Sequence, residues 1–198
     1  MESFRVHRGV VAPLPRADID TDQIIPKQFL KRVERTGYGD FLFWDWRVDQ
    51  KGRARPDFVL NEEVFRGASI LVTRDNFGCG SSREHAAWAL RDYGFRAVLA
   101  PSLADIFRRN ADANGIAALA LDAQEIETIL ERARDEAPLS LTIDIEHGTV
   151  SDGSGVVARF ELDEFRRMCL MEGLDRIGLT LRHEEDIAAY EAARWPER

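Results

Sequence analysis

The most regular pattern in the chain is a series of short apolar runs between residues 69 and 136, each followed by a stretch with apolar residues at helical spacing. Short apolar runs bounded by polar turns predict buried strands, and the amphipathic stretches predict helices. The predicted strands are 70–72, 97–100 and 117–121, and the predicted helices are 83–93, 103–113 and 124–136. Strands that alternate with helices predict a parallel sheet with right-handed crossovers.

The segments before and after this series follow different patterns. Residues 4–11 alternate imperfectly and predict a strand that ends before Pro13. Residues 139–145 alternate strictly, and 156–160 follow a turn rich in Asp and Gly, so these two segments predict an antiparallel hairpin. Further helices are expected at 26–30, at 162–172 with Asp163 as N-cap, and at 184–193. The predicted fold class is α/β, with a parallel core sheet and additional antiparallel strands.

The least regular stretch is 35–57, which we interpret as an excursion from a single domain that spans residues 1–198. The excursion holds a dense set of aromatic side chains, namely Tyr38, Phe41, Phe43, Trp44 and Trp46. These side chains either form a core beneath a long loop or provide a contact surface for another chain, because aromatic residues are also enriched in the centres of interfaces.

Composition and charge exclude several classes of protein. The 198 residues carry 27 Lys and Arg against 35 Asp and Glu, a net charge of −8, which argues against non-specific binding to nucleic acid. The longest apolar run, Ile116–Leu121, has six residues, far fewer than the roughly 20 that cross a bilayer. The first residues show no apolar export region, so we expect a cytoplasmic protein without a membrane segment. Two cysteines are too few for a disulfide framework or a self-contained zinc or iron–sulfur site, so no metal is expected on this chain.

The residues that follow the predicted strand 70–72 carry the strongest chemical signal. Residues 75–85 read Asp-Asn-Phe-Gly-Cys-Gly-Ser-Ser-Arg-Glu-His. They lie between a strand and a helix of the parallel series, and ligands bind beyond the carboxyl ends of strands in such sheets. Gly78 and Gly80 permit backbone angles and a close approach that side chains would forbid, so we expect them to shape an anion-binding turn.

Three interpretations of this turn compete. In the first, it is an ordinary glycine turn with Ser81 as N-cap and Glu84 in the capping-box position. In the second it is a phosphate loop, although no Gly-Lys-Ser or Gly-Lys-Thr follows. In the third, the N–H groups near Ser81, Ser82 and Arg83 face outward at a helix N-terminus and bind a carboxylate, with Arg83 adding a planar bidentate fork. A serine hydroxyl in that positive potential is a candidate for proton transfer.

Longer motifs point to a known family. Residues 76–86 (Asn-Phe-Gly-Cys-Gly-Ser-Ser-Arg-Glu-His-Ala) resemble the signature of the swivel domain of the aconitase superfamily, and residues 18–30 resemble its companion motif. Further segments resemble the family of small subunits of 3-isopropylmalate dehydratase in particular: 36–39, 43–47, 105–107, Asn110, Asn114 with Gly115, 160–167 and 173–181. The resemblance covers almost the whole chain and implies the swivel-type β/β/α domain of that superfamily.

The resemblance also implies a hydro-lyase reaction of leucine biosynthesis on a small dicarboxylate. In it 2-isopropylmalate loses water to give 2-isopropylmaleate, which takes water back at the neighbouring carbon to give 3-isopropylmalate. The family's 4Fe-4S cluster needs three cysteine ligands, and this chain has only Cys79 and Cys169. The cluster is therefore expected on a separate large subunit, with which this chain would form a heterodimer.

Individual roles follow from the same resemblance. Ser81 matches the serine that abstracts a proton beside a carboxylate, and Asp22 matches an aspartate that supports the site. The substrate-binding residues implied are Thr21, Ser82, Arg83, Phe29, Leu30 and Lys31. Apolar contact by Phe29 and Leu30 would suit an isopropyl group, at roughly 0.8 kcal/mol per buried methylene.

Two other functions stay open from the sequence. The first is a small subunit of a related hydro-lyase that acts on citraconate or methylmalate, dimethylmaleate or homoaconitate, which the loop around Phe29 to Arg32 would distinguish. The second is a non-catalytic anion-binding or regulatory module with the same fold. Cys79, Cys169 and His85 are interpreted as structural residues, because no partner for nucleophilic or metal chemistry accompanies them.

Overall fold

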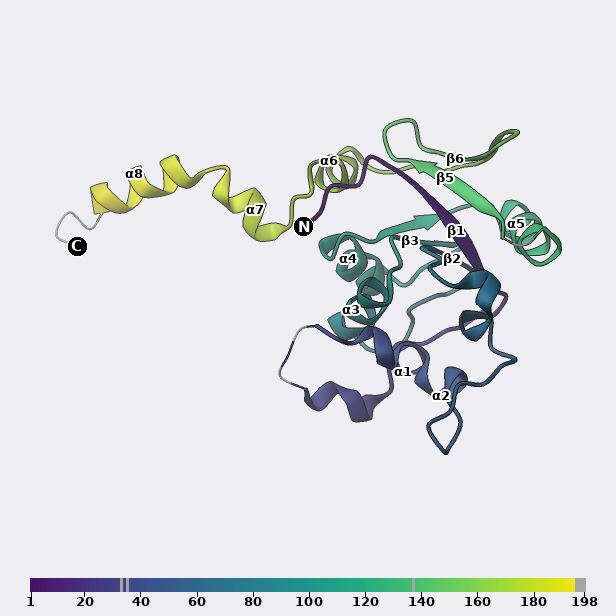
Figure 1. Ribbon diagram of the computed structural model, residues 1–198. Coiled ribbons are helices and arrows are strands. Elements are labelled where there is room, and N and C mark those ends of the chain that lie inside the picture. The colour runs from purple at the N-terminus through teal and green to yellow at the C-terminus, as the bar shows by residue number, and fades with distance from the viewer. Residues whose placement is uncertain (33, 35, 137, 195–198) are drawn as a thin grey trace.

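A seven-stranded sheet forms the centre of the protein in the computed structural model, which describes residues 1–32, 34, 36–136 and 138–194 (Figure 1). The strand order is β4-β3-β2-β1-β5-β6-β7. The strands are β1 (Val6–Leu14), β2 (Ile70–Thr73), β3 (Ala97–Ala100), β4 (Ala117–Ala120), β5 (Ser140–Asp144), β6 (Thr149–Asp152) and β7 (Gly155–Arg159). The parallel pairing of β1 through β4 and the antiparallel pairing of β5 through β7 confirm the predicted fold class.

Strand β1 joins the two halves of the sheet. Its first half pairs antiparallel with β5, from Val6 opposite Asp144 to Val10 opposite Ser140. Its second half pairs parallel with β2, where Pro13 lies opposite Val72. The prediction that this strand ends before Pro13 is therefore wrong. The nitrogen of Pro13 lies on the β5 side, like that of Val11, and β5 no longer pairs there, so the missing N–H costs no ladder hydrogen bond.

The predicted hairpin between 139–145 and 156–160 is also incorrect in its pairing. Strand β6 lies between the two segments and pairs antiparallel with β5 on one side and with β7 on the other. Only four residues long and with one buried side chain, Val150, β6 has too little apolar alternation to be recognised in the sequence.

The longer helices cover both faces of the parallel half. They are α3 (Glu84–Tyr93), α4 (Asp105–Ala113), α5 (Ala123–Asp135) and α6 (Glu164–Glu172), within a few residues of the predicted bounds. Alternate residues of β2 enter different cores: Leu71 packs with the side of α3 and α4, whereas Ile70 and Val72 pack with α5. Burial on both faces explains why these strands read as continuous apolar runs. Asp163 caps α6 as expected, accepting from the N–H of Arg166.

The excursion packs its aromatic side chains onto α3. Short turns of helix run through it and its flanks: α1 (Thr21–Ile24), η1 (Lys27–Lys31), η2 (Gly39–Phe41), α2 (Trp44–Arg47), η3 (Val59–Asn61) and η4 (Glu63–Phe65). Tyr38 and Phe43 are fully buried, which supports the core interpretation for these two. Phe41, Trp44 and Trp46 keep part of their surface exposed. Gly39 sits so close to α3 that an added Cβ would lie 2.7 Å from the backbone of Asp92 and Tyr93.

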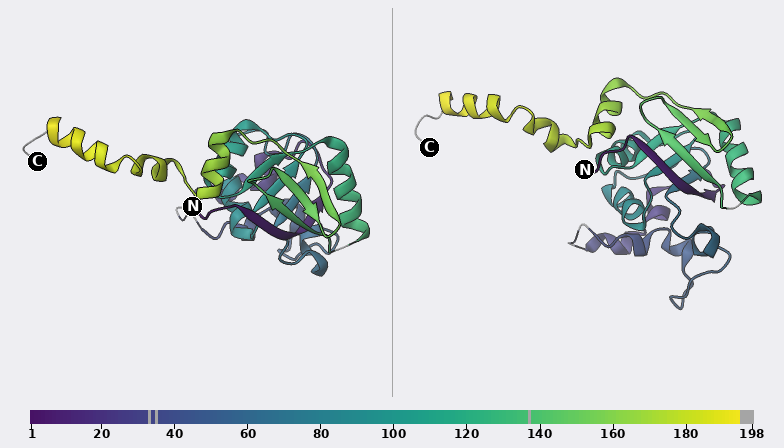
Figure 2. Two further views of the ribbon diagram at one scale, coloured as in Figure 1. Left: turned by 90° about the horizontal axis from the view of Figure 1, so that it is seen from above. Right: turned by 45° about the horizontal axis from the view of Figure 1, so that its top comes forward.

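The C-terminal helices α7 (Arg176–Leu181) and α8 (Glu184–Arg194) leave the body of the protein as an arm, which Figures 1 and 2 show from three directions. Neither helix contains a buried residue. None of the helices in the described ranges is long and apolar enough to cross a membrane.

We expect Gly39→Ala to destabilise the fold by about 1–3 kcal/mol, because its methyl group would overlap the α3 backbone. Gly153→Ala is the matched control, since nothing lies within 4 Å of its Cβ position, and its effect should stay within about 0.5 kcal/mol. Urea denaturation of both variants measures the difference. Equal effects would show that the excursion does not pack closely on α3.

Candidate active site

Two turns meet at the carboxyl ends of β1 and β2, because these neighbouring parallel strands end at the same edge of the sheet. The turn after β1 is 18–22, and the turn after β2 is 75–83. Three backbone hydrogen bonds join them: the N–H of Asp18 donates to the carbonyl of Asp75 (2.9 Å), that of Gly78 to Ile19 (2.7 Å), and that of Thr21 to Cys79 (3.0 Å). Residues about 60 positions apart in the sequence thus form one rigid unit.

The two glycines of this unit have different reasons to be glycine. Gly78 has a left-handed φ of 76°, and a Cβ there would lie 2.2 Å from the ring of Phe107 in α4. Gly80 has a φ of 88° but only ordinary contacts around its Cβ position. Close packing therefore requires the first glycine, whereas backbone angle alone favours the second.

Thr21 holds the backbone of Ser81 at both polar groups. The Oγ1 of Thr21 donates to the Ser81 carbonyl at 3.1 Å and accepts from the Ser81 N–H at 3.2 Å. Thr21 is buried, whereas Ser81 is exposed. The hydroxyl of Thr21 is therefore occupied within the chain, and the side chain of Ser81 extends from a backbone that is fixed on both sides.

Asp22 connects three elements of the site. Its carboxylate accepts from Nη1 of Arg83, and Nζ of Lys27 lies 3.2 Å from its other oxygen. The guanidinium of Arg83 is largely buried, with 15 % of its side chain exposed, while Lys27 is mostly exposed. The pair fixes Arg83 at the start of α3, and Lys27 places the beginning of η1 beside it. Sequence reasoning missed Lys27, although a lysine five residues after Asp22 in a predicted helical turn was an available signal.

Helix α3 begins without a capping side chain. Its N-cap is Arg83, whose side chain makes no capping hydrogen bond, so the interpretation of Ser81 as N-cap with Glu84 in a capping box is wrong. Ser81 gives its N–H to Thr21 instead, and Glu84 accepts from the Asn114 amide at 3.1 Å. Among the described residues, no acceptor is present for the N–H groups of Ser82, Arg83, Glu84 and His85. An uncapped helix N-terminus carries partial positive charge and donors that suit a carboxylate.

The loop expected to contact the substrate's side chain is η1. Phe29 and Leu30 are partly buried and pack against the main core, while Lys31 is exposed. The ring of Phe29 stacks on Phe41 at 4.1 Å between centroids and meets Trp44 edge-on at 5.3 Å. Phe29 therefore anchors η1 to the excursion, a contact that the sequence pattern does not indicate.

Burial shifts the pKa values of two further groups beside the turn. Burial lowers the pKa of His85, the charge of Glu84 opposes that shift, and the charge of Arg83 adds to it. Burial raises the pKa of the Cys79 thiol, and the carboxylates of Asp20 and Asp18 raise it further. A thiol with a raised pKa is a poor nucleophile at neutral pH, so the geometry favours the structural interpretation of Cys79.

Comparison with known proteins gives the family. The family model described as Aconitase C-terminal domain matches residues 1–124, and the model for the C-terminal domain of the 3-isopropylmalate dehydratase small subunit matches residues 177–198. The chain is 56% identical over 193 residues to the 3-isopropylmalate dehydratase small subunit of Koribacter versatilis, covering 98% of this chain and 99% of that one. It belongs to the 3-isopropylmalate dehydratase small-subunit family.

Other members of the small-subunit family agree in extent and fold. The protein of that name from Rhodopirellula baltica is 56% identical over 195 residues, with 98% of this chain and 100% of the relative covered. The crystal structure of 3-isopropylmalate dehydratase from Methanocaldococcus jannaschii superposes with a TM-score of 0.64 over 94% of this chain and 99% of that one, at 22% identity. That solved structure confirms the swivel-type α/β fold expected from the resemblance.

The residues of this small subunit do not fit an iron–sulfur cluster. Cys79 lies in the turn after β2 and Cys169 in α6, so the two thiols belong to different elements. In the described part of the chain, no group of three or more His, Cys, Asp or Glu side chains is placed to hold a metal ion.

The environment of His85 predicts how the stability of the protein depends on pH. Because its pKa is lowered in the folded state, the unfolded chain binds more protons below the ordinary value of about 6.5. His85 thus contributes stability that is complete above about pH 6.5 and is lost as the pH falls toward the folded pKa. An NMR titration should give a midpoint below 6.5 for His85, assigned with His85→Gln, and Arg83→Gln should raise that midpoint. A midpoint at or above 6.5 would contradict this environment.

Proposed function

We propose that this chain is the small subunit of a 3-isopropylmalate dehydratase and that it supplies the proton-transfer side of the isomerisation of 2-isopropylmalate to 3-isopropylmalate. Family membership supports the activity. The observation that carries the residue roles is the exposed hydroxyl of Ser81 at the uncapped N-terminus of α3, next to an arginine that Asp22 holds in place.

Arg83 and the helix N-terminus bind a substrate carboxylate. The guanidinium is oriented by Asp22, so its remaining N–H groups are pre-organised for a second carboxylate. The free N–H groups that begin with Ser82 add donors on the same side of the turn. Pre-organised donors of this kind also stabilise the negative charge that develops on a carboxylate when the adjacent carbon loses a proton.

Ser81 is the base in this proposal. Its oxygen takes the proton from the carbon beside the bound carboxylate, the carbon–carbon double bond of 2-isopropylmaleate forms, and hydroxide leaves the neighbouring carbon. In the return step, hydroxide adds at the carbon that first lost the proton, and the proton is delivered from Ser81 to the other carbon. A serine hydroxyl is a weak acid, and the charge of Arg83 together with the α3 dipole stabilises its deprotonated form.

The remaining assignments follow from the placement of each side chain. Thr21, which the resemblance alone would make a substrate contact, acts as a positioning residue for Ser81, because its hydroxyl bonds both backbone groups of that serine. Asp22 orients Arg83. Leu30, Lys31 and the exposed edge of Phe29 face the substrate's side chain from η1.

The partner in this proposal is a large subunit, and the two chains form a heterodimer in the cytoplasm. The name of the family's members, small subunit, supports a second chain. Ser81 and Ser82 are exposed, so another surface has to close over them before water is excluded from the reaction. Since the described residues offer no cluster site, we assign the 4Fe-4S cluster to the large subunit.

Removal of the base tests the central assignment. Ser81→Ala, reconstituted with the large subunit, should lower kcat for 2-isopropylmalate by at least about 100-fold, because general-base catalysis contributes that much or more. Ser154→Ala is the control, since Ser154 is exposed in the turn between β6 and β7 and only its backbone N–H is bonded. Turnover of Ser81→Ala within a fewfold of that control would rule out Ser81 as the base.

The role of Thr21 is tested by two substitutions that differ in one hydroxyl. Thr21→Val removes both hydrogen bonds to Ser81 and should lower kcat by about 10- to 100-fold with little change in KM, because a misplaced base affects the chemical step. Thr21→Ser keeps the hydroxyl and should restore most of kcat. If Thr21→Val raises KM and leaves kcat unchanged, Thr21 contacts the substrate rather than positioning the serine.

A further inference from the structure

The arm of α7 and α8 exposes large apolar side chains with nothing packed on them in the described part of the chain. Ile177 is 70% exposed, Leu181 56%, Ile187 39% and Tyr190 58%. Phe165, on the adjoining face of α6, is 59% exposed. A continuous set of exposed apolar side chains on a segment with no buried residue indicates a surface that packs against another chain.

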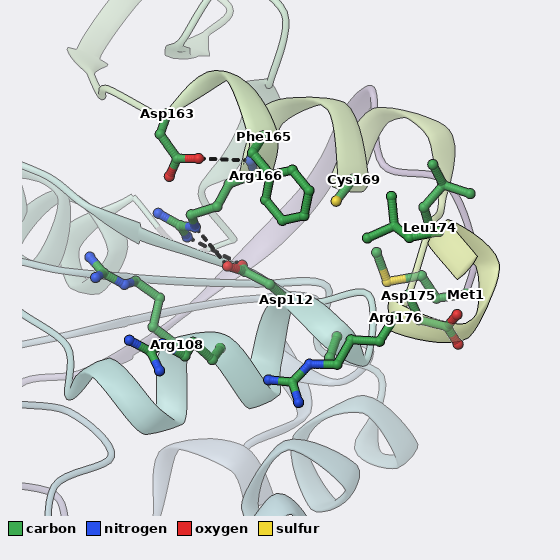
Figure 3. A pocket seen from close by; sticks show the side chains of 13 residues that line it. Met1, Arg108, Asp112, Asp163, Phe165, Arg166, Cys169, Leu174, Asp175 and Arg176 are labelled. Atoms are coloured by element: carbon green, nitrogen blue, oxygen red, sulfur yellow. Dashed lines mark hydrogen bonds and ion pairs between the residues drawn. The ribbon is translucent and has the colours of Figure 1, made fainter. Parts of the chain in front are cut away.

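A pocket of about 490 Å³ lies at the base of this arm, between α4, α6 and α7 (Figure 3). Its lining includes apolar side chains from α6 and the start of the arm, among them Phe165, Leu174 and Leu179. Arginines from α4 and α7 lie along one side of it, as Arg108 and Arg176 show in Figure 3.

Two of the pocket's arginines are available for an incoming acid. Arg166 is paired with Asp112 at 2.7 Å, and Arg108 with Asp105 at 2.7 Å. Arg109 and Arg176, by contrast, have no acidic partner among the residues that the structure describes. The pocket therefore combines an apolar wall with unpaired positive charge.

Helix α8 has the complementary character. Its first turn contains Glu184, Glu185 and Asp186, and the apolar Ile187 and Tyr190 follow. An acidic turn with adjacent apolar side chains matches a pocket with an apolar wall and free arginines. Helix α8 cannot reach the pocket of its own chain, because α7 already lines that pocket and α8 continues away from it (Figures 1 and 2).

We propose that two copies of this chain exchange their arms, so that α8 of each copy occupies the pocket at the base of the other copy's arm. Because the pocket adjoins the arm's own base, two arms that run antiparallel about a two-fold axis place both α8 helices on both pockets at once. Such a contact is isologous and closes at the dimer. It does not depend on the proposed reaction.

The size of the available surface is sufficient for a stable dimer. A second groove, lined by Phe165, Met168, Leu179 and Ile187 among others, continues the apolar surface from the pocket along the arm. The arm spans residues 176–194, and each copy would contribute both an arm and a pocket. This set is comparable to the roughly 20–30 residues per side of a standard interface.

The other candidate occupant is the large subunit. The second copy is favoured because both complementary halves, the acidic arm and the basic pocket, are present on this one chain and lie next to each other. Sedimentation of the full chain alone, followed by sedimentation with the large subunit, separates the two occupants.

The full-length chain should sediment as a dimer of twice its 22.5 kDa mass. A chain that ends at Arg182 should be monomeric and should keep its unfolding transition, because α8 buries no residue of the body. A monomeric wild-type chain at the highest soluble concentration would overturn the proposal, and so would a dimer that persists without α8. Arm-dependent association with the large subunit alone would assign the arm to that partner and would equally overturn it.

Charge reversal tests the pairing itself. The double variant Glu184→Lys with Glu185→Lys, and separately Arg109→Glu with Arg176→Glu, should each weaken self-association at least about 10-fold, because like charges then meet in both contacts. An equimolar mixture of the two variants should restore the dimer, since one contact is then wild type and the other has both charges reversed. Failure of the mixture to recover the dimer would reject the exchange of arms into the pockets.

Discussion

The hydrogen bonds between the turn after β1 and the turn after β2 are the constraint on which the site depends. They are short-range contacts between segments far apart in sequence, and they exist only because β1 and β2 are parallel neighbours whose carboxyl ends coincide. The paired strands bring the turns together, Thr21 then fixes the backbone of Ser81, and Asp22 fixes Arg83. The chemistry of the serine is set by its neighbours, and those neighbours are set by the sheet.

The same dependence explains which parts could be predicted from sequence. Buried strands such as β3 and helices such as α5 were predicted nearly to the residue, because apolar periodicity is local and strong there. The motif around Ser81 and Arg83 was recognisable as a segment, as was Asp22. The start of α3 was not: a Ser-x-x-Glu pattern favours a capping box, but Thr21, which is distant in the sequence, takes the Ser81 N–H first. Strand β6, with a single buried residue, and the ion pair of Lys27 with Asp22 are likewise determined by tertiary partners.

The site is built as one side of a larger cavity. Donors for a carboxylate, an oriented guanidinium and an exposed hydroxyl lie on the surface of this chain, and the apolar groups of η1 adjoin them. Phe29 ties that loop to the aromatic excursion, and the excursion is seated on α3 through Gly39 and the buried Tyr38. The loop for the substrate's side chain and the helix that carries the base are therefore parts of one packed unit, so a change in either is transmitted through core contacts.

The divided pairing of β1 has a consequence for the order in which the chain folds during synthesis. Residues 6–14 are among the first to leave the ribosome, yet one half of their ladder is completed by β2 and the other half by β5. At roughly 5–20 residues per second, β1 waits on the order of ten seconds for β5, with unpaired backbone groups along that edge. The central strand of the sheet is thus finished late, and the nascent chain is most open to wrong strand pairing during that interval.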